Sequence, residues 1–499
     1  MLKEDKSSID ICIYDIEKCF DALWLEDVLS DYFDSLPEEK VDDKLALVYE
    51  SNRNNYVAIK TTVGLTKRVN IEKIVTQGGT FGPIECSNSI DKIGQKSFTE
   101  GKNLFQYKKM VKIPPLGYID DILTISNCGT ASLSMNTFVN TEIECKRLKF
   151  HTPDANGRSK CHFIHVGKET IPCPKLQVHG EDIIKVEEDT YLGDIITSNG
   201  KHLETIKSRI SKGTGIICQI MTILDKITMG KHYFETALLL RESMFINSIL
   251  VNAEIWYGIS NSELEKLSKL DQTLLRKILN TQISTPIESL YLELGCIDIE
   301  TLLKGRRLIY LHYLTQRKAD TMLKRFFMAQ WKYPSKGDWT EQIILDLDEF
   351  NISRDLEEIK SYSTYIFKKL VKRKAREVAF TKFMTAKSHH SKLQNLHYGQ
   401  LTVQKYFTQN QFSVTESRLI FSFRTRMAQF KCNFKKEKEL TCPLCKLHLD
   451  DQNLVLQCPE IMKICKSTEN ICNIYSENIS TILVKTLARI LEFRNNVSS

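Results

Sequence analysis

Three aspartates that stand far apart in the sequence are the residues best suited to chemistry. Asp15 directly follows an apolar run, and Asp120 and Asp121 are adjacent within the stretch Gly117–Ile125. Two prolines just before that stretch exclude an incoming helix, so we expect a β-hairpin with Asp120 and Asp121 at or near its turn. Carboxylate oxygens are the donors that Mg²⁺ and Mn²⁺ prefer. If separate strands bring Asp15 to the hairpin, the site would suit two ions roughly 3.5–4 Å apart, as phosphoryl transfer requires.

The stretch Gln77–Pro83 is the second unusual feature. Its glycines permit backbone conformations and close approaches that other residues forbid. Pro83 suits the first turn of a helix, which we expect over residues 84–93. A simple loop between a strand and this helix is an equally good interpretation of the stretch.

Apolar periodicity predicts the elements that must position these residues. Up to about residue 200 strands alternate with helices, and Asp15 lies at the end of a strand, where α/β folds place their chemistry. From 201 to 330 the period is helical, and Thr285–Glu288 predicts a capping box with Pro286 at the first helical position. The expected strands are 9–14, 56–62, 68–75, 122–125 and 161–166, with a strand-and-turn unit at 191–196, and the helices before residue 200 are 22–33, 44–52, 84–93 and 131–149.

Length and charge favour several domains and a polyanionic partner. The chain has 499 residues, enough for two or three domains, and its net charge is +7. Residues 361–440 hold 17 Lys and Arg against 4 Asp and Glu, so this segment alone carries +13. A basic segment on a mildly acidic body suggests a nucleic-acid partner, although a solvated helical surface has the same composition.

Cysteine use and the lack of long apolar segments predict an intracellular protein without a membrane span. The 15 cysteines have no framework spacing, and the N-terminus lacks the apolar region of a signal peptide. No run approaches the roughly 18 apolar residues that cross a bilayer. We therefore expect free thiols and a nuclear and/or cytoplasmic location. The run Lys372–Arg376 is a nuclear localisation signal, a nucleic-acid contact or plain solvated surface.

Five short motifs follow one another along the first 200 residues. They are Tyr14–Asp21, Gln77-Gly78 with Gly82-Pro83, Tyr118–Asp121, Arg158–His162 and Tyr191–Gly193. In this order and spacing they resemble the palm motifs of the reverse transcriptases of non-LTR, LINE-like retrotransposons. The third resembles the Tyr-x-Asp-Asp hairpin and the fifth the primer grip. Each motif is weak alone, but jointly they are specific, and the resemblance covers nearly the whole chain.

The resemblance implies catalytic roles for four charged residues. Asp15 and Asp120 would be ligands of Mg²⁺ (or Mn²⁺), with Asp121 beside them. Lys160 lies where the fourth motif has its lysine, and it would donate a proton to the pyrophosphate leaving group. These residues would together carry two-metal nucleotidyl transfer.

The resemblance also implies a set of substrate contacts. Phe20, five residues after Asp15, would be the aromatic gate that clashes with a ribose 2′-OH and so favours dNTPs. Gln77 and Gly78 would support the template and the nascent base pair, and Tyr118 would join this substrate-binding set. Phe20 and Tyr118 have a second interpretation as core aromatics.

The implied fold is α+β: a right-hand polymerase palm with partial fingers over 1–200, a helical thumb over 201–332 and a basic helical region over 333–499. The implied function is RNA-directed DNA synthesis in target-primed reverse transcription, with an RNA template, a DNA primer or target and dNTPs as partners. Asp15 lies only 14 residues from the start, so we expect most of the family's fingers region to be missing. The alternatives are a catalytically incompetent, nucleic-acid-binding remnant and a generic metal-dependent nuclease.

A cysteine cluster near the C-terminus predicts a zinc knuckle. Cys442 and Cys445 have the spacing of one half of such a site, and Cys458 is a candidate third ligand. The histidine that family members often carry five residues before the last cysteine is an asparagine here, so His448 or Cys465 would complete the site. A decayed site with free thiols is the alternative.

Aromatic side chains are mixed with bases in the same C-terminal region. Such mixing suits single-stranded RNA, which binds by base stacking and phosphate contacts. The alternative is that the aromatics form a helical core. The residues concerned are Tyr406, Phe407, Phe412, Phe421, Phe423 and Phe430, with Arg418, Arg424 and Arg426 near them.

Overall fold

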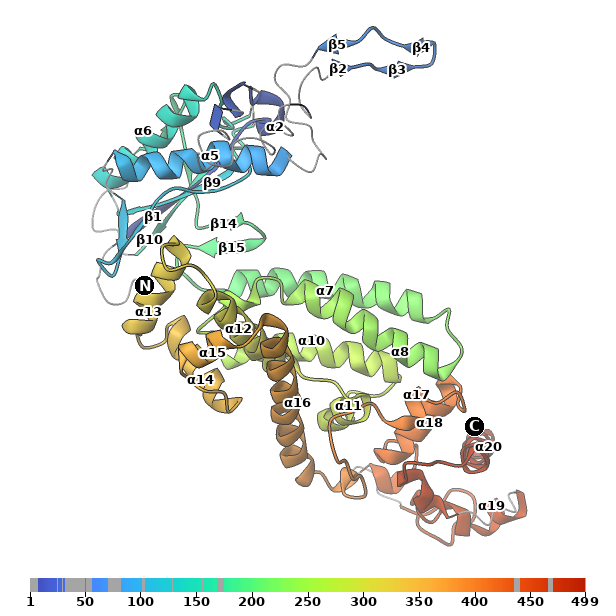
Figure 1. Cartoon of the computed structure of the whole chain (residues 1–499). Helices are drawn as coiled ribbons and strands as arrows, with labels where there is room; N and C mark the ends of the chain where they lie inside the picture. The colour runs from blue at the N-terminus through green and yellow to red at the C-terminus, as the bar shows by residue number, and fades with distance from the viewer. Residues whose placement is uncertain are drawn as a thin grey trace. The chain divides into compact units, whose positions relative to one another are not determined.

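The chain forms two compact units, and many of their helices and strands are labelled in Figure 1. The first comprises 1–202 with 318–333, and the second 203–317 with 334–499. Strands and helices share the first unit and helices build the second, so the α+β class is confirmed. The regions predicted as thumb and C-terminal domain thus contribute to one unit. The computed structural model describes residues 8–498 except 25, 29, 32–49, 51–55, 71–81, 101–103, 128, 155, 168–174, 435–439 and 465–469.

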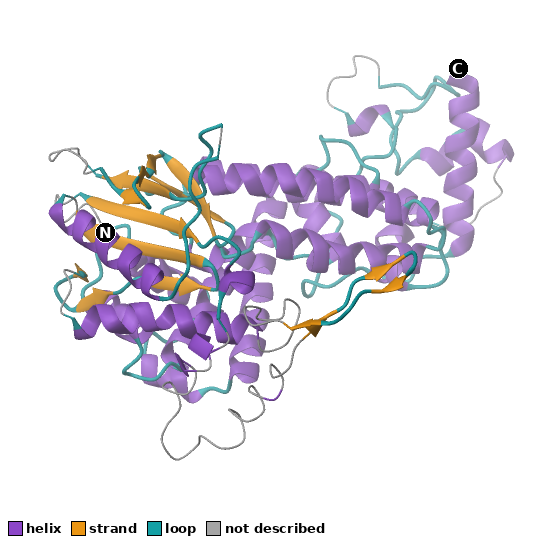
Figure 2. Ribbon diagram, turned by 90° about the horizontal axis from the view of Figure 1, so that it is seen from above, coloured by secondary structure: helices purple, strands orange, loops and turns teal. Residues whose placement is uncertain are grey.

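A five-stranded sheet lies at the centre of the first unit (Figure 2). Its order is β13-β10-β1-β9-β8, and the central β1 (Ile9–Asp15) pairs antiparallel with β9 (Asp121–Asn127) and β10 (His162–Val166). β8 (Leu116–Tyr118) forms a hairpin with β9, and β13 (Ile184–Lys185) runs parallel to β10. The predicted hairpin and the predicted strands beside it are therefore confirmed.

Both faces of this sheet are covered. Helices α5 (Gly82–Thr99) and α6 (Thr130–Cys145) pack on one face, and α13 (Met322–Lys332) packs on the other. Successive strand residues point to opposite faces, so β1 contributes to two cores. Cys12 and Tyr14 lie in the core under α5 and α6, and Ile9 lies in the core under α13 with the hairpin β6 (Phe105–Tyr107) and β7 (Val111–Ile113).

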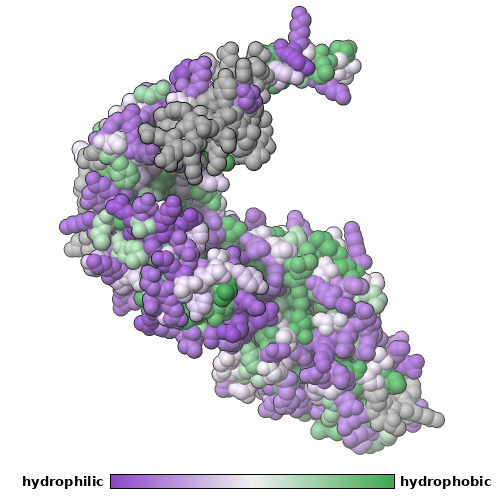
Figure 3. All heavy atoms as spheres, viewed as in Figure 1, coloured by the Kyte–Doolittle hydropathy of each residue, from purple (hydrophilic) through white to green (hydrophobic). Residues whose placement is uncertain are grey.

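The other strands of the first unit form short hairpins. The ribbon at 56–70 shows hydrophilic and hydrophobic side chains at its surface (Figure 3), and its pairing confirms the paired strands predicted around Gly64 as far as residue 70. Residues 71–75 of the second predicted strand lie outside the described residues. The unit at 191–196 is confirmed as a hairpin as well. The ribbon consists of β2 (Tyr56–Val57) with β5 (Val69–Asn70) and β3 (Lys60–Thr61) with β4 (Gly64–Leu65), and the remaining pairs are β11 (Gln177–Val178) with β12 (Glu181–Asp182) and β14 (Glu188–Tyr191) with β15 (Asp194–Thr197).

The helix predicted over 22–33 is confirmed only in part. Helix α2 (Cys19–Ala22) begins earlier and ends before Leu23, whose extended backbone (ψ 128°) separates it from the helical residues 26–28 and 30–31. The helix expected over 44–52 lies almost wholly outside the described residues.

The second unit is built from helices, and a large apolar core cluster in it includes residues from Ile206 to Ile490. On α10 (Asn261–Leu279), Leu267, Leu274 and Ile278 are fully buried. The other helices of the unit are α7 (Leu203–Leu224), α8 (Gly230–Leu240), α9 (Asn247–Ile249), α11 (Ile287–Leu294), α12 (Ile299–Thr315), α14 (Trp339–Glu349), α15 (Leu356–Ser361), α16 (Thr364–Ser388), α17 (Lys405–Thr408), α18 (Val414–Arg424), α19 (Pro459–Ile464) and α20 (Thr481–Ser498).

The capping box predicted at the start of α11 is wrong. Pro286 occupies the cap position, and no side chain there accepts a cap hydrogen bond. The Thr285 hydroxyl instead lies 2.6 Å from the Thr281 hydroxyl. Within the described residues, no helix has the length and apolar character required to cross a membrane.

Candidate functional site

Asp15 and Asp121 lie opposite one another at one end of the five-stranded sheet. They are register partners in the antiparallel pair of β1 and β9. Directly opposed residues of such a pair share a face, with Cβ atoms roughly 4.5–5.5 Å apart. The Ile16 amide donates to the Asp120 carbonyl oxygen at 3.1 Å, which holds Asp120 beside the same strand end. The fold thus gathers three carboxylates from two distant segments.

A tight turn presents Asp120 and Asp121. Tyr118 pairs with Asp121, so Ile119 and Asp120 form a two-residue hairpin loop. Ile119 has φ +58°, which is rare for a β-branched residue, and such strain tends to occur at functional sites. The surrounding structure holds the turn, because the Cys86 thiol donates to the Ile119 carbonyl oxygen at 3.5 Å.

Helix α5 supports this hairpin through two close contacts. A Cβ built on Gly117 would lie 2.4 Å from Ile90 Cγ2, so glycine allows α5 to pack directly on β8. Cys86 of α5 lies with its sulfur 2.8 Å from the Cys19 sulfur, and both thiols are buried. The predicted helix after Gly82-Pro83 is therefore confirmed, and it connects the first and third sequence motifs.

The negative charge of the carboxylates is only partly compensated, by Lys160. Burial, followed by repulsion from Asp120 and Asp15, raises the pKa of Asp121, while Lys160 acts in the opposite direction. The Lys160 ammonium lies 3.1 Å from Asp15 Oδ2, and its side chain is 61% exposed against 16% for Asp15. Hard, clustered oxygen donors that repel one another fit Mg²⁺ or Mn²⁺ by their chemistry.

The spacing of these donors sets what binding would require. In the described part of the chain, one group of three or more His, Cys, Asp or Glu residues has all its ligand atoms within 4.8 Å of one another, and its members are cysteines. The oxygens of the three aspartates therefore do not all lie within 4.8 Å of one another. Mg²⁺ keeps several waters and takes one or two carboxylates, so binding requires only that they approach the ion.

The predicted aromatic contacts differ in exposure. Tyr118 is 55% exposed at the end of β8, so its interpretation as a core residue is wrong. Phe20, in α2, is half-buried and packs against the core beneath α5 and α6. Gln77 and Gly78 lie outside the described residues.

Asp189 is a site residue that the sequence prediction missed. It repels Asp121 electrostatically, and its Oδ2 lies 2.7 Å from His162 Nδ1. Burial and Asp121 raise the pKa of Tyr191 to about 12. Asp189 and Tyr191 are two positions apart in the strand 188–191 and therefore share a face, but only the fold shows that both lie near the aspartates.

Three of the four predicted zinc-site residues converge. Cys442, Cys445 and Cys458 have all their sulfur atoms within 4.8 Å, a spacing that suits a thiolate metal site. Burial raises the pKa of Cys458 to about 11. Although burial acts against it, backbone N–H groups of Leu447 and His448 lower the pKa of Cys445.

The structure does not support His448 as the fourth zinc ligand. Its carbonyl oxygen accepts a hydrogen bond from the Cys442 amide at 2.8 Å, but its side chain is exposed and is not part of the cysteine group. The other candidate, Cys465, lies outside the described residues.

The hypothesis that C-terminal aromatics stack on RNA is wrong for the residues named. All six are at most 3% exposed and belong to the core of the second unit. Arg418 donates to the Ile278 carbonyl oxygen, and Arg424 pairs with the buried Glu293 at 3.1 Å. These residues therefore stabilise the fold.

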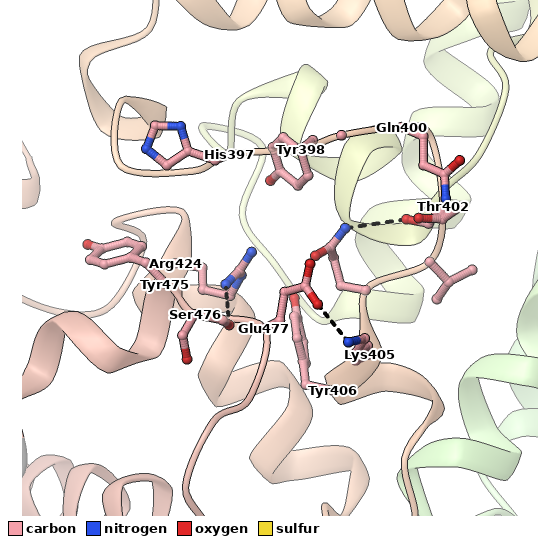
Figure 4. Close-up of a pocket in the computed structure, with 13 residues that line it drawn as sticks. His397, Tyr398, Gln400, Thr402, Lys405, Tyr406, Arg424, Tyr475, Ser476 and Glu477 are labelled. Atoms are coloured by element: carbon pink, nitrogen blue, oxygen red, sulfur yellow. Dashed lines mark hydrogen bonds and ion pairs between the residues drawn. The ribbon is translucent and has the colours of Figure 1, made fainter.

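The hydrogen-bond network around Arg424 forms part of the wall of a polar cavity of about 390 Å³ in the second unit. Figure 4 shows Arg424 between the loop that carries Tyr398 and the segment that carries Glu477. The hydroxyls of Tyr398 and Tyr406 donate to the Glu293 carboxylate at 2.5 and 2.6 Å. The cavity wall is thus a satisfied structural network.

Comparison with solved structures finds distant likenesses. No protein-family model and no curated protein sequence matches the chain. A telomerase from Candida tropicalis, in complex with a TWJ fragment of telomeric RNA, aligns with a TM-score of 0.31 and 12% identity over 73% of this chain and 50% of that one. The Candida albicans counterpart gives 0.32 and 11% over 72% and 50%, and apo telomerase from Candida tropicalis gives 0.31 and 12% over 68% and 54%. This chain spans about half the length of those chains, and the functional assignment rests on its carboxylate site.

Proposed function

We propose that this chain is the RNA-directed DNA polymerase of a non-LTR retrotransposon, acting in target-primed reverse transcription. The observation that carries the proposal is the register of Asp15 against Asp121 at the end of a hairpin whose turn holds Asp120. Two distant acidic motifs meet there, as two-metal nucleotidyl transfer requires. The order of the five motifs supports the same function.

In this proposal Asp15, Asp120 and Asp121 hold divalent ions. Mg²⁺ bound there would lower the pKa of a primer 3′-hydroxyl and offset charge on the dNTP triphosphate. Burial, followed by repulsion from Asp120 and Asp15, raises the pKa of Asp121, and this repulsion favours cation binding. The exposed Lys160 side chain would turn from Asp15 to the pyrophosphate and donate a proton to it.

Two aromatics would contact the substrate beside these carboxylates. Phe20 follows Asp15 on a short helix and packs against the core, and a ring held in this way can exclude a ribose 2′-OH. Tyr118 stands next to the hairpin turn and is exposed to an incoming strand. Gln77 and Gly78 would support the template.

We also propose that Cys442, Cys445 and Cys458 hold Zn²⁺, which would stabilise the C-terminal region. Sulfur donors within 4.8 Å of one another can share a tetrahedral ion. The partners implied by the whole proposal are an RNA template, a DNA primer and dNTPs, and the implied location is nuclear and/or cytoplasmic.

Primer extension by the full chain tests the polymerase proposal. The chain should incorporate dTTP on poly(rA) primed with oligo(dT) in the presence of Mg²⁺. Asp120→Ala should lower the rate by at least about 100-fold, because one preorganised charge contributes that much to such steps. Asp320→Ala, which alters an exposed carboxylate of the same unit, is the matched control.

Three outcomes would count against polymerisation. Absence of incorporation, with binding of the primed template retained, would identify a non-catalytic nucleic-acid-binding protein. Metal-dependent loss of template without extension would indicate a nuclease. Equal rates for Asp120→Ala and the unchanged chain would remove the carboxylate site from the mechanism.

A further inference from the structure

The N-terminal half of α16 carries an exposed stripe of bases with one aromatic residue. Tyr365 lies three and four positions before the adjacent Lys368 and Lys369, and Lys372 lies four and three positions after them, which places the four on neighbouring turns of one side of the helix. All four are exposed, Tyr365 to 74%. The opposite face holds the helix in the core through Phe367, Val371, Ala375, Ala379 and Phe383.

The three lysines of this α16 stripe have no acidic partner among the described residues. Other bases of α16 do: Lys374 lies 3.3 Å from Glu377, and Lys382 lies 2.9 Å from Asp298. Like charges at positions i and i+4 destabilise a helix, as Lys368 and Lys372 must here. The α16 stripe is therefore a positive surface that the fold leaves uncompensated.

The start of α16 adds to this positive charge. A helix N-terminus carries a partial positive charge, which an acidic residue in the first turn would offset. Helix α16, like α6, α8 and α13, has no acidic residue in its first turn. Ser363 caps the Ile366 amide with its hydroxyl, so the end is well formed as well as positive. Phosphate groups suit such a surface.

We propose that the α16 stripe binds single-stranded nucleic acid. Lys368, Lys369 and Lys372 contact consecutive phosphates, and Tyr365 stacks on a base. A ring exposed on a convex helix reaches a base face only where the bases are unstacked, which excludes a regular duplex. That the polyanion is a nucleic acid rests on the proposed polymerase function. The α16 stripe itself lies in the second unit, and a binding test of it does not require catalysis.

Salt-dependent binding by the full chain tests this inference. Fluorescence anisotropy with a labelled homouridine oligonucleotide would give the affinity across a salt series. The variant Lys368→Gln/Lys369→Gln/Lys372→Gln should reduce the slope of log affinity against log salt by about 2, because each single-strand phosphate contact contributes about 0.7. The matched control is Lys212→Gln/Lys226→Gln/Lys266→Gln, which removes three exposed lysines of the same unit and should keep the original slope.

A second pair of variants tests the stacking contact. Tyr365→Leu should weaken binding by about 5- to 100-fold, whereas Tyr365→Phe, which retains the ring, should bind like the unchanged chain. Circular dichroism establishes that every variant keeps its helical content. An unchanged slope for the stripe variant, or equal losses for both triple variants, would overturn the inference. Asp15→Asn should bind the oligonucleotide normally. If a chain without polymerase activity binds through the α16 stripe, that result refutes only the polymerase proposal.

Discussion

The Lys160 ammonium lies 3.1 Å from the Asp15 carboxylate, although the two residues are 145 positions apart in the chain. The lysine side chain is mostly exposed and Asp15 is mostly buried, so the lysine is free to move while the carboxylate is held. The pKa of Asp121 is raised by burial and by its carboxylate neighbours, and Lys160 opposes that rise. In the proposed mechanism, Lys160 would compensate the charge of Asp15 before substrate binds and contact the triphosphate afterwards.

Replacing Lys160 should slow nucleotide incorporation. Lys160→Ala should lower the rate about 100-fold, in the range of general acid catalysis, and Lys160→Arg should retain part of it because the charge remains. Lys149→Ala, at an exposed position nearby in sequence, is the control. Single-turnover primer extension measures the rate, and an undiminished rate for Lys160→Ala would exclude the assigned role.

Removing the charge of Asp121 should stabilise the first unit at neutral pH. Its pKa is raised in the folded state, so its contribution to stability is full below the unfolded value of about 3.9 and is lost as pH rises through the folded-state pKa. Asp121→Asn should therefore raise Tm by a few degrees near pH 7 and give little gain near pH 4. Scanning fluorimetry measures Tm, and a lowered Tm near pH 7 would contradict the proposed repulsion.

Mg²⁺ should also change the thermal stability of the chain. Ion binding to the folded chain raises Tm by mass action, and the effect should shrink in Asp121→Asn, which lacks one ligand. Asp320→Asn, at an exposed position of the same unit, should respond to Mg²⁺ like the unchanged chain. A Tm that is insensitive to Mg²⁺ and Mn²⁺ would argue against the metal site.

A side chain at Gly117 should separate α5 from the hairpin. The added Cβ in Gly117→Ala would lie 2.4 Å from Ile90 Cγ2, and such overpacking costs about 1–3 kcal/mol. Gly215→Ala is the contrasting control, because no heavy atom lies within 4 Å of a Cβ there and alanine favours a helix by about 0.5–1 kcal/mol. Calorimetry should show a lower Tm for the first variant and a higher Tm for the second.

Truncating Arg424 should destabilise the second unit. Arg424→Met leaves the buried Glu293 without its cationic partner, which costs about 3–5 kcal/mol. Arg373→Met, on the exposed face of α16, should change the free energy of unfolding by less than about 0.5 kcal/mol. Urea unfolding followed by circular dichroism compares them, and similar effects would exclude the structural role of Arg424.

The cysteine group should bind one zinc ion. Chain purified with Zn²⁺ should contain about one ion per molecule, and Cys442→Ser/Cys445→Ser should contain none. Cys218→Ser, which changes an exposed thiol, should keep the ion. Mass spectrometry of the native chain measures the stoichiometry, and a folded, metal-free chain after zinc loading would exclude the site.

Local sequence chemistry accounts for much of the fold. The apolar run before Asp15, the prolines before the hairpin and Pro83 after the glycines each act on their own neighbours. The strand β1, the hairpin β8–β9 and helix α5 therefore form where the sequence predicts them. The prediction failed where local patterns were ambiguous: Thr285 suits a cap, but Pro286 takes that position.

The sequence by itself determined which residues could act, because carboxylates, thiols and lysines carry their chemistry wherever they lie. Only the tertiary structure decided which of them meet. Strand register set Asp15 opposite Asp121, and long-range packing buried the C-terminal aromatics and left His448 outside the cysteine group. Such contacts join segments far apart in the chain. They depend on how all apolar surfaces compete for burial, which no local pattern encodes.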